Sequence, residues 1–419
     1  MNESIDLSLY PESTALAQNG TLLIGGCRID DLATEFGTPA YIIDEGALRR
    51  RAREYIHAFQ TRHADTLVLF ASKSFPSASV VKVLTEEGCG IDVAAEGELF
   101  IACRAGADPG KMVLHGNAKS DSDIKAALAA GIGYIVIDNE NDVERIARLA
   151  KTPQPVLLRV SPAIHAATHQ SMATGHDESK FGIPSTQINS MISRIRQEKL
   201  LDLHGLHMHI GSQIVVLEQF EAAIAALSRL ERFPVYNFGG GLGVRYVSED
   251  VTPSVDEFAD MMITAAHRHL GKGIKILIEP GRSMIARNGV TLYRVLTVKH
   301  GVRTHVAVDG GMGDNLEVSL YGQKFQPSIL NKDGTMVVCD VVGRHCESGD
   351  TLATQVSLTE PAVDDLLAVP VTGAYCFTMA NNYNGALKPP VVFCRDGVAR
   401  LAVRRQTQES LVEREMLLP

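Results

Sequence analysis

The chain has 419 residues, which predicts about two domains at a typical ~100–200 residues per domain. Its 49 acidic residues outnumber its 40 basic ones, and the net charge of −9 argues against nucleic acid as a partner. No apolar run approaches the ~20 residues that span a bilayer, and the acidic, polar N-terminus is unlike a signal peptide, so we expect neither a membrane segment nor a leader.

The predicted elements begin with TLLIGGCRI, a strand-like stretch within residues 1–40 that we expect to join the second domain. From residue 67 to 281, short apolar runs alternate with Ala-, Glu- and Arg-rich segments of helical periodicity. Such alternation indicates buried parallel strands in βα units. The runs are LVLFASK, GIDVAA, MVLHG, YIVID, VLLRV, GLHMHIG, VYNFGGG and ILIEPG. Eight βα units predict a closed (β/α)8 barrel over residues 41–284, with residues 41–60 leading into it; an open doubly wound sheet is the alternative.

After about residue 285 the pattern changes to strands that are joined by Gly- and Asp-bearing turns, with little helix between them. The strand-like runs are VTLYRVLTVKH, THVAVDGG, TMVVCDVVG, DLLAVPVTGAY and PPVVFCRDGVARLAVRR. They predict an antiparallel β domain over residues 285–419. The predicted fold class is therefore α/β, a TIM barrel followed by a C-terminal antiparallel β domain.

Polar groups stand at several predicted strand ends, which is where a (β/α)8 barrel carries its chemistry. They are Lys73, Asp92, Arg159, His207, His209, Ser212, Glu279, Arg282 and the glycine run at 239–243. Lys73 directly follows a buried strand, and a desolvated ammonium is costly unless it is paired or takes part in chemistry.

The chemistry of these groups points to one cofactor. The glycine run lies where barrels bind phosphate, with a tight turn as the plain alternative. His207 and His209 share one strand face, but no further ligands at metal-site spacing stand out, so we expect no metal. Glu279 is either a surface carboxylate or the partner of a protonated ring nitrogen. A Schiff-base lysine, a phosphate-binding turn, a stacking imidazole and such a carboxylate together indicate pyridoxal phosphate (PLP).

The seven cysteines are scattered singly, without a CxxC pair. Their spacing fits neither a disulfide framework nor a zinc site. We therefore expect free thiols in a cytoplasmic protein.

Seven motifs carry a resemblance to a known family. FASKS, HMHIGSQ, NFGGGLG and IEPGR resemble the motifs of alanine-racemase-fold PLP decarboxylases. VAVDGGMGDN, GRHCESGD and GAYCFTMANNYN resemble those of diaminopimelate decarboxylases, and the motifs run in order over nearly the whole chain. The resemblance implies a PLP barrel, a β domain and a homodimer with active sites shared across the interface.

The resemblance also implies roles for single residues. Lys73 would hold PLP covalently, His209 would stack on its ring, and Glu279 would pair with its ring nitrogen. The implied cofactor-binding residues are Lys73, Asp92, Arg159, His209, Ser212, Gly239, Gly240, Gly241, Glu279, Gly281, Arg282 and Tyr375. The implied substrate-binding residues are Arg282, Glu317, Tyr321, Glu347 and Tyr375. Lys73 and Cys346 would be catalytic, with Cys346 and Glu347 arriving from the other subunit.

The predicted activity is the decarboxylation of an amino acid, with meso-2,6-diaminopimelate to L-lysine as the first choice. Loss of CO2 leaves a carbanion that a protonated ring stabilises, and the thiol of Cys346 suits the reprotonation. An amino-acid racemase is one alternative, but it would need a second base in place of the Cys346–Glu347 pair. A non-catalytic PLP-binding protein is another, but it would lack Lys73 or Cys346.

The stretch GDNLEVSLYG departs from the family, which usually carries Arg-Pro where this chain has Glu317 and Val318. That arginine, with the one matching Arg282, grips the substrate's distal carboxylate, and a glutamate there would repel it. Three readings stay open: Arg282, Tyr321 or Lys324 holds the carboxylate with Glu317 turned away; the loop is shifted; or the distal group is an amine or neutral, as in D-lysine or D-ornithine. We predict that Glu317 contacts the distal end and changes specificity.

Overall fold

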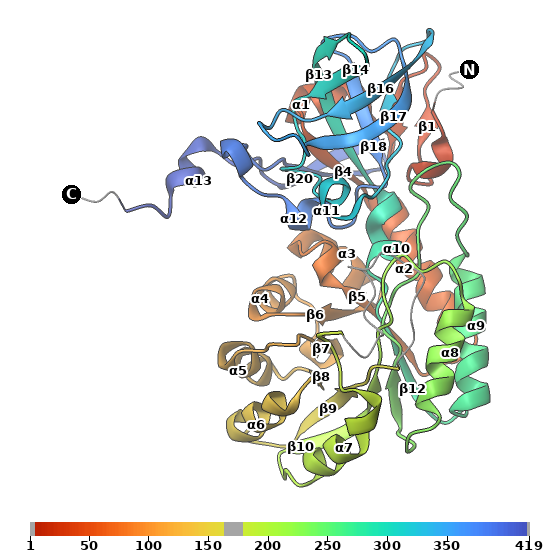
Figure 1. Ribbon diagram of the computed structural model, residues 1–419, viewed down its shortest axis with the longest axis vertical. Coiled ribbons are helices and arrows are strands. Elements are labelled where there is room, and N and C mark those ends of the chain that lie inside the picture. Colours follow the sequence, from red (N-terminus) through yellow and green to blue (C-terminus); the bar gives the residue numbers. More distant parts are fainter. Residues whose placement is uncertain (1–4, 163–178, 417–419) are drawn as a thin grey trace. The chain divides into compact units, whose positions relative to one another are not determined.

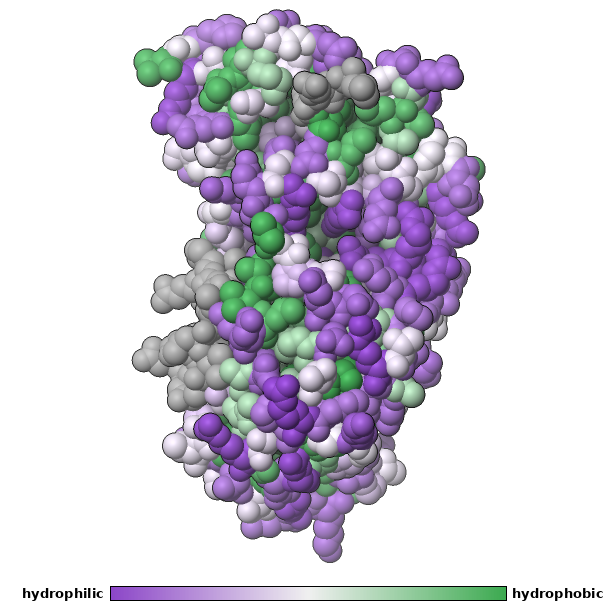
Figure 2. Space-filling model, turned by 90° about the vertical axis from the view of Figure 1, so that its right-hand side faces the viewer, coloured by the Kyte–Doolittle hydropathy of each residue, from purple (hydrophilic) through white to green (hydrophobic). Residues whose placement is uncertain are grey.

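The chain divides into two compact units in the computed structural model, which describes residues 5–162 and 179–416. The barrel unit comprises residues 51–244 and 252–284, and the β unit comprises residues 1–50, 245–251 and 285–419. No helix within the described ranges is long and apolar enough to cross a membrane. Hydrophilic side chains predominate on the face that Figure 2 shows, with smaller groups of hydrophobic ones between them.

A closed sheet of eight parallel strands forms the centre of the barrel unit (Figure 1). Its strands are β5 (Thr66–Ala71), β6 (Gly90–Val93), β7 (Met112–Leu114), β8 (Tyr134–Ile137), β9 (Gln154–Arg159), β10 (Leu201–His207), β11 (Val235–Asn237) and β12 (Lys275–Ile278). The last strand pairs with the first, Ile276 beside Thr66, which closes the barrel and excludes an open sheet. The eight predicted runs are the eight barrel strands, and the predicted fold class is confirmed.

A helix follows each barrel strand along the chain. These helices are α3 (Ala78–Glu86), α4 (Glu96–Arg104), α5 (Asp121–Ala130), α6 (Glu140–Leu149), α7 (Ile188–Arg196), α8 (Glu218–Leu227), α9 (Val255–His269) and the short α10 (Arg282–Ile285), and α2 (Glu45–Gln60) precedes the first strand. Capping boxes start two of them, Ser120 with Asp123 for α5 and Ser254 with Glu257 for α9. Helices surround the sheet in Figure 1, so the outer face of each strand is covered.

Aliphatic side chains from six strands fill the barrel interior. They are Leu69, Val113, Val136, Leu157, Val235 and Leu277, and all six are buried. Because helices cover the outer face and this layer fills the inner one, β6 and β7 are buried at every position. Burial on both faces explains why these strands read as continuous apolar runs rather than as alternating ones.

The β unit is built on a nine-stranded, mainly antiparallel sheet. Its strands are β4 (Ala40–Asp44), β13 (Gly289–Lys299), β14 (Thr304–Val308), β15 (Ser328–Ile329), β16 (Met336–Val342), β17 (Thr351–Thr359), β18 (Leu366–Pro370), β19 (Val391–Arg395) and β20 (Val398–Val403). Two pairs, β14 with β16 and β4 with β19, are parallel. Strand β4, which comes from the segment read as a lead into the barrel, lies between β13 and β19 of this sheet.

Smaller elements complete the β unit. The strands β1 (Ala15–Leu16), β2 (Leu22–Ile24) and β3 (Cys27–Arg28) form a separate three-stranded sheet. The helices are α1 (Ile29–Phe36), α11 (Glu317–Tyr321), α12 (Cys376–Met379) and α13 (Gln408–Val412).

Candidate active site

The predicted site residues fall into two groups, one in each unit. The barrel unit carries Lys73, Asp92, Arg159, His209, Ser212, Gly239, Gly240, Gly241, Glu279, Gly281 and Arg282. The β unit carries Glu317, Tyr321, Cys346, Glu347 and Tyr375. The barrel group gathers at the C-terminal ends of the strands, where this fold places its active sites.

Lys73 lies in a single 3-10 turn, Ser72–Ser74, directly after β5. Its side chain is exposed, so the expectation of a desolvated ammonium is wrong for this chain. Burial raises the pKa of Asp92 and of Glu98, and the charge of Lys73 opposes that rise; burial and the charge of Lys73 both lower the pKa of His209. Lys73 is therefore an accessible amine that faces two carboxylates and an imidazole.

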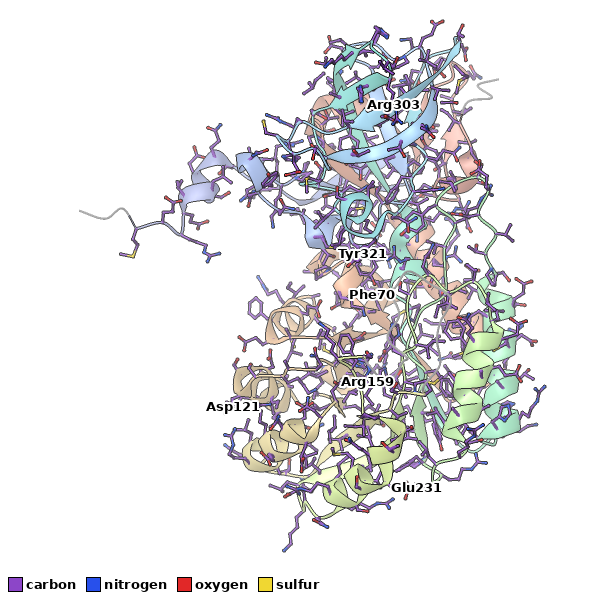
Figure 3. The ribbon with its side chains drawn as sticks, in the orientation of Figure 1. Phe70, Asp121, Arg159, Glu231, Arg303 and Tyr321 are labelled. Carbon is purple, nitrogen blue, oxygen red and sulfur yellow. The ribbon has the colours of Figure 1, made fainter. Side chains whose placement is uncertain are left out.

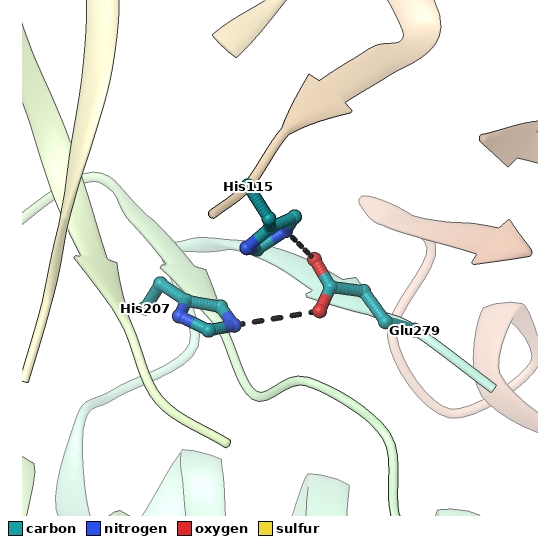
Figure 4. A group of neighbouring side chains, drawn as sticks. All are labelled: His115, His207 and Glu279. Atoms are coloured by element: carbon teal, nitrogen blue, oxygen red, sulfur yellow. Dashed lines mark hydrogen bonds and ion pairs between the residues drawn. The ribbon is translucent and has the colours of Figure 1, made fainter. Parts of the chain in front are cut away.

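Glu279 follows β12 and is the centre of a buried polar network (Figure 4). Its Oε1 accepts hydrogen bonds from Asn237 Nδ2 at 2.6 Å and from His115 Nε2 at 2.7 Å, and His207 Nε2 lies 3.4 Å from Oε2. Burial raises the pKa of a carboxyl group, but His115 and His207 outweigh it and hold the pKa of Glu279 well below its usual range. Glu279 is thus a buried, ionised carboxylate, as a partner for a protonated ring nitrogen must be.

The two imidazoles of this network have different charge preferences. Burial lowers the pKa of His207 to about 3, so its ring is neutral. Burial also lowers the pKa of His115, but Glu279 and Asp92, whose Oδ1 is 3.7 Å from Nε2, raise it by more. Burial in turn raises the pKa of Asp92 to about 7. His115 is therefore the imidazole that can carry charge beside Glu279.

Ligand atoms of His115, His207 and Glu279 lie within 4.8 Å of one another, which is the kind of grouping that a metal ion uses. The sequence pattern did not show this grouping, because its members come from three strands. The hydrogen bond of His115 to Glu279 and the 3.4 Å approach of His207 to the same carboxylate account for the closeness of the three side chains.

His209 follows β10 and presents a neutral ring. Its Nδ1 accepts the N–H of Gly240 at 3.2 Å, which places the proton of the neutral imidazole on Nε2. Burial, with the nearby charges of Lys73 and Arg159, lowers the pKa of His209 well below its usual value. A flat, uncharged ring fits the predicted stacking on a cofactor.

The glycine run after β11 packs closely against the neighbouring strand ends. Gly239 and Gly241 have positive φ values of 66° and 124°, and a Cβ on Gly240 would lie 2.1 Å from the carbonyl oxygen of Glu279. The N–H of Gly239 donates to Asn237 Oδ1, and that of Gly240 donates to His209. Two of the three predicted phosphate donors are thus engaged within the chain, and phosphate binding by this run stays a prediction.

Arg282, Gly281, Ser212 and Arg159 occupy the same end of the barrel. Arg282 is buried and its Nε donates to Ser212 Oγ at 3.2 Å. A Cβ on Gly281 would lie 3.0 Å from that of Ala71, so close packing favours glycine there. Arg159 ends β9, where Figure 3 labels it, and its guanidinium lies over a phenylalanine ring at 4.4 Å.

Cys346 and Glu347 lie at the tip of an exposed loop in the β unit. Asp350 holds this loop, because its Oδ1 accepts the N–H of Met312 at 2.6 Å and its Oδ2 accepts that of His345 at 2.7 Å. The N–H of Cys346 donates to a further side chain, Asn384 Oδ1, at 2.8 Å. The thiol is therefore presented to solvent on a loop with a fixed backbone.

Tyr375 and Tyr321 are half-buried residues next to short helices. Tyr375 immediately precedes α12 with a φ of 65°, a left-handed conformation that is uncommon for an aromatic residue and is often retained at functional sites. Tyr321 ends α11, as Figure 3 shows.

Glu317 begins α11 and its side chain has no exposed surface. The hydroxyl of Tyr246 donates to its Oε2 at 3.4 Å. This carboxylate is closed off from solvent. The burial favours the reading in which Glu317 is turned away, and its contact with substrate stays a prediction.

Two residues of the Glu279 network were not singled out in the sequence. His115 follows β7 and Asn237 ends β11. Both stand at a barrel strand end, in MVLHG and VYNFGGG, and this strand-end position is the same signal that predicts Lys73 and Glu279.

Comparison with known proteins gives consistent matches. Residues 45–286 match the family model for the pyridoxal-binding domain of pyridoxal-dependent decarboxylases. A diaminopimelate decarboxylase from Actinosynnema pretiosum subsp. auranticum is 41% identical, over 99% of this chain and 96% of its own length. The chain belongs to the diaminopimelate decarboxylase family.

Solved structures of diaminopimelate decarboxylases agree. One from M. jannaschii has a TM-score of 0.91 at 28% identity and covers 98% of this chain and 99% of its own. One from Helicobacter pylori, complexed with L-lysine, has a TM-score of 0.86 at 29% identity. Its match covers 92% of this chain and 98% of its own. As a member of the diaminopimelate decarboxylase family, the chain is a PLP-dependent decarboxylase. An accessible lysine, a neutral imidazole and a buried carboxylate anion fit that cofactor.

Proposed function

We propose that this chain decarboxylates meso-2,6-diaminopimelate to L-lysine and CO2, as a step of lysine biosynthesis. The match to a diaminopimelate decarboxylase over 99% of the chain carries this proposal. The burial of Glu317 supports it, since a carboxylate without exposed surface is not presented to the distal carboxylate of the substrate. Arg282, Tyr321 and Lys324 are then the candidates for holding that carboxylate.

Bound PLP supplies the electron sink for the pair that is left when CO2 departs. Lys73 would hold its aldehyde carbon, His209 would cover its ring face, and Glu279 would face its ring nitrogen. An adjacent carboxylate anion favours the protonated form of a base, so Glu279 keeps a proton on that nitrogen. Cys346 would return a proton to the carbon that has lost CO2, as a general acid.

We also propose that the protein is cytoplasmic and that it forms a homodimer whose active sites are shared between the two subunits. Cys346 lies at an exposed loop tip in the β unit, and the family resemblance implies that it enters the active site of the other subunit. Mixing inactive Lys73→Ala and Cys346→Ala proteins should then restore some activity, because one hybrid site carries both groups. No recovery under conditions of subunit exchange counts against sharing. All seven cysteines are free thiols, which suits a reducing compartment.

A substrate panel tests the proposed reaction. The holoenzyme is assayed for kcat/KM with meso-diaminopimelate, D-lysine, D-ornithine and L-ornithine. We expect meso-diaminopimelate to be preferred by at least ~10^2-fold, since a site that pairs a polar group rejects analogues that lack it. Glu317→Gln, which keeps the shape of the side chain, should leave that preference unchanged.

A preference for D-lysine or D-ornithine that Glu317→Gln abolishes would show instead that Glu317 reads a basic distal group. In that case the proposed substrate is wrong. Lys73→Ala serves as the inactive control in each assay.

A further inference from the structure

We propose that His115 is a positioning residue that holds Glu279 as an oriented, ionised carboxylate against the cofactor's ring nitrogen. This inference rests on the proposed role of Glu279 in PLP binding. His115 does not itself reach the reacting atoms in this scheme. It acts through Glu279, with which it shares a 2.7 Å hydrogen bond.

The barrel places several charged and titratable groups around this carboxylate. They are Lys73 after β5, Asp92 on β6, His115 after β7, Arg159 on β9, and His207 and His209 on and after β10. Among them, His115 makes the shortest contact with the Glu279 oxygens, at 2.7 Å against 3.4 Å for His207. The geometry therefore singles out His115 as the charge-bearing partner of Glu279.

The remaining donors cannot replace His115. Asn237 is neutral at every pH, and burial keeps His207 neutral because it lowers its pKa to about 3. Without His115, the remaining hydrogen-bond donors to Glu279 are neutral. The charge of Arg159 still acts on this carboxylate, but burial raises its proton affinity. A protonated Glu279 no longer favours charge on the ring nitrogen, so the electron sink weakens.

The loop after β7 is fixed at both ends, which keeps His115 in place. Lys119 Nζ donates to the carbonyl oxygen of Gly116 at 2.6 Å and pairs with Asp142 Oδ2 at 2.7 Å, and neither charged side chain has exposed surface. Asn139 Nδ2 donates to the carbonyl oxygen of Asn117 at 2.9 Å. The loop is thus tied to itself and to the following βα unit, as a positioning role requires.

Two variants separate hydrogen bonding from charge. His115→Leu removes both, and His115→Gln retains an N–H donor without a charge. His204→Gln is the matched control, because His204 lies on β10, is partly exposed and pairs with Asp202 instead. The readouts are the absorption spectrum of bound PLP against pH, PLP affinity, kcat and KM against pH, and the melting temperature.

We expect His115→Leu to lower kcat by about 10–100-fold, as loss of an orienting partner does at metal sites, with KM within about twofold. It should also give kcat and the cofactor spectrum an acidic limb that wild type lacks. His115→Gln should recover part of kcat but keep the acidic limb. His204→Gln should match wild type.

A His115→Leu enzyme with wild-type kcat and spectrum would overturn the proposal. So would equal losses in both His115 variants accompanied by a common fall in melting temperature, since these would show a merely structural role. If wild type forms no lysine while the spectral shift appears as expected, the substrate is wrong and the role of His115 stands.

Discussion

The Lys119→Met substitution removes one partner of an ion pair whose two side chains have no exposed surface. The remaining Asp142 keeps one N–H donor, from Asp138 at 3.0 Å to Oδ2, while its buried Oδ1 accepts no hydrogen bond among the described residues. Breaking a buried pair in this way typically costs about 3–5 kcal/mol. For a unit of this size that lowers the melting temperature by roughly 6–20 °C.

Thermal unfolding followed by circular dichroism measures the effect. Lys111→Met is the matched control, because Lys111 is exposed just before β7, and it should change stability by less than about 0.5 kcal/mol. The double variant Lys119→Met, Asp142→Leu should recover part of the loss, since it leaves no buried charge. A melting temperature of Lys119→Met within about 2 °C of wild type would refute the buried anchor.

Three further results are expected. Burial lowers the pKa of His207 from 6.5 to about 3, so its contribution to stability is present above pH ~6.5 and is lost as the pH falls toward 3. In His207→Phe, the urea midpoint of unfolding should therefore depend less on pH between pH 6.5 and 4 than it does in wild type. Parallel pH profiles of the two proteins would contradict this. Cys346→Ala should lower kcat by ~10^2–10^4-fold at unchanged PLP content, and a wild-type rate would remove Cys346 from the mechanism. Gly240→Ala should lower the free energy of unfolding by about 1–3 kcal/mol and weaken PLP binding, because its Cβ would lie 2.1 Å from the Glu279 carbonyl oxygen. Gly97→Ala, which has open space around it, should change neither property. Equal stability of the two variants would argue against the close packing.

Local pattern was enough to predict the barrel strands, because burial on both faces leaves an apolar run in most of them, as in β6 and β7; β10, with Asp202 and His204, is the exception. It was not enough for β4, whose apolar residues 40–44 read like a lead into the barrel. Their partners, β13 and β19, lie far along the chain, and the choice between two sheets depends on that distant pairing.

In the candidate active site, too, some features follow from the local sequence and others depend on distant contacts. Strand-end position predicted Lys73 and Glu279, because every barrel strand delivers its last residues to the same end. The side-chain contacts were not predictable: the hydrogen bond of His115 to Glu279 joins residues 164 positions apart, and that of Tyr246 to Glu317 joins residues 71 apart. Such contacts depend on rotamers that a linear pattern does not encode.

The central claim, that the barrel's strand ends hold PLP through Lys73, is tested most directly by trapping the cofactor on the protein. The holoenzyme is reduced with borohydride, digested, and mapped by mass spectrometry. The pyridoxyl adduct is predicted on Lys73, with visible absorbance lost on reduction and no adduct in Lys73→Ala. An adduct on another lysine, or none on wild type that contains PLP, would contradict the assignment.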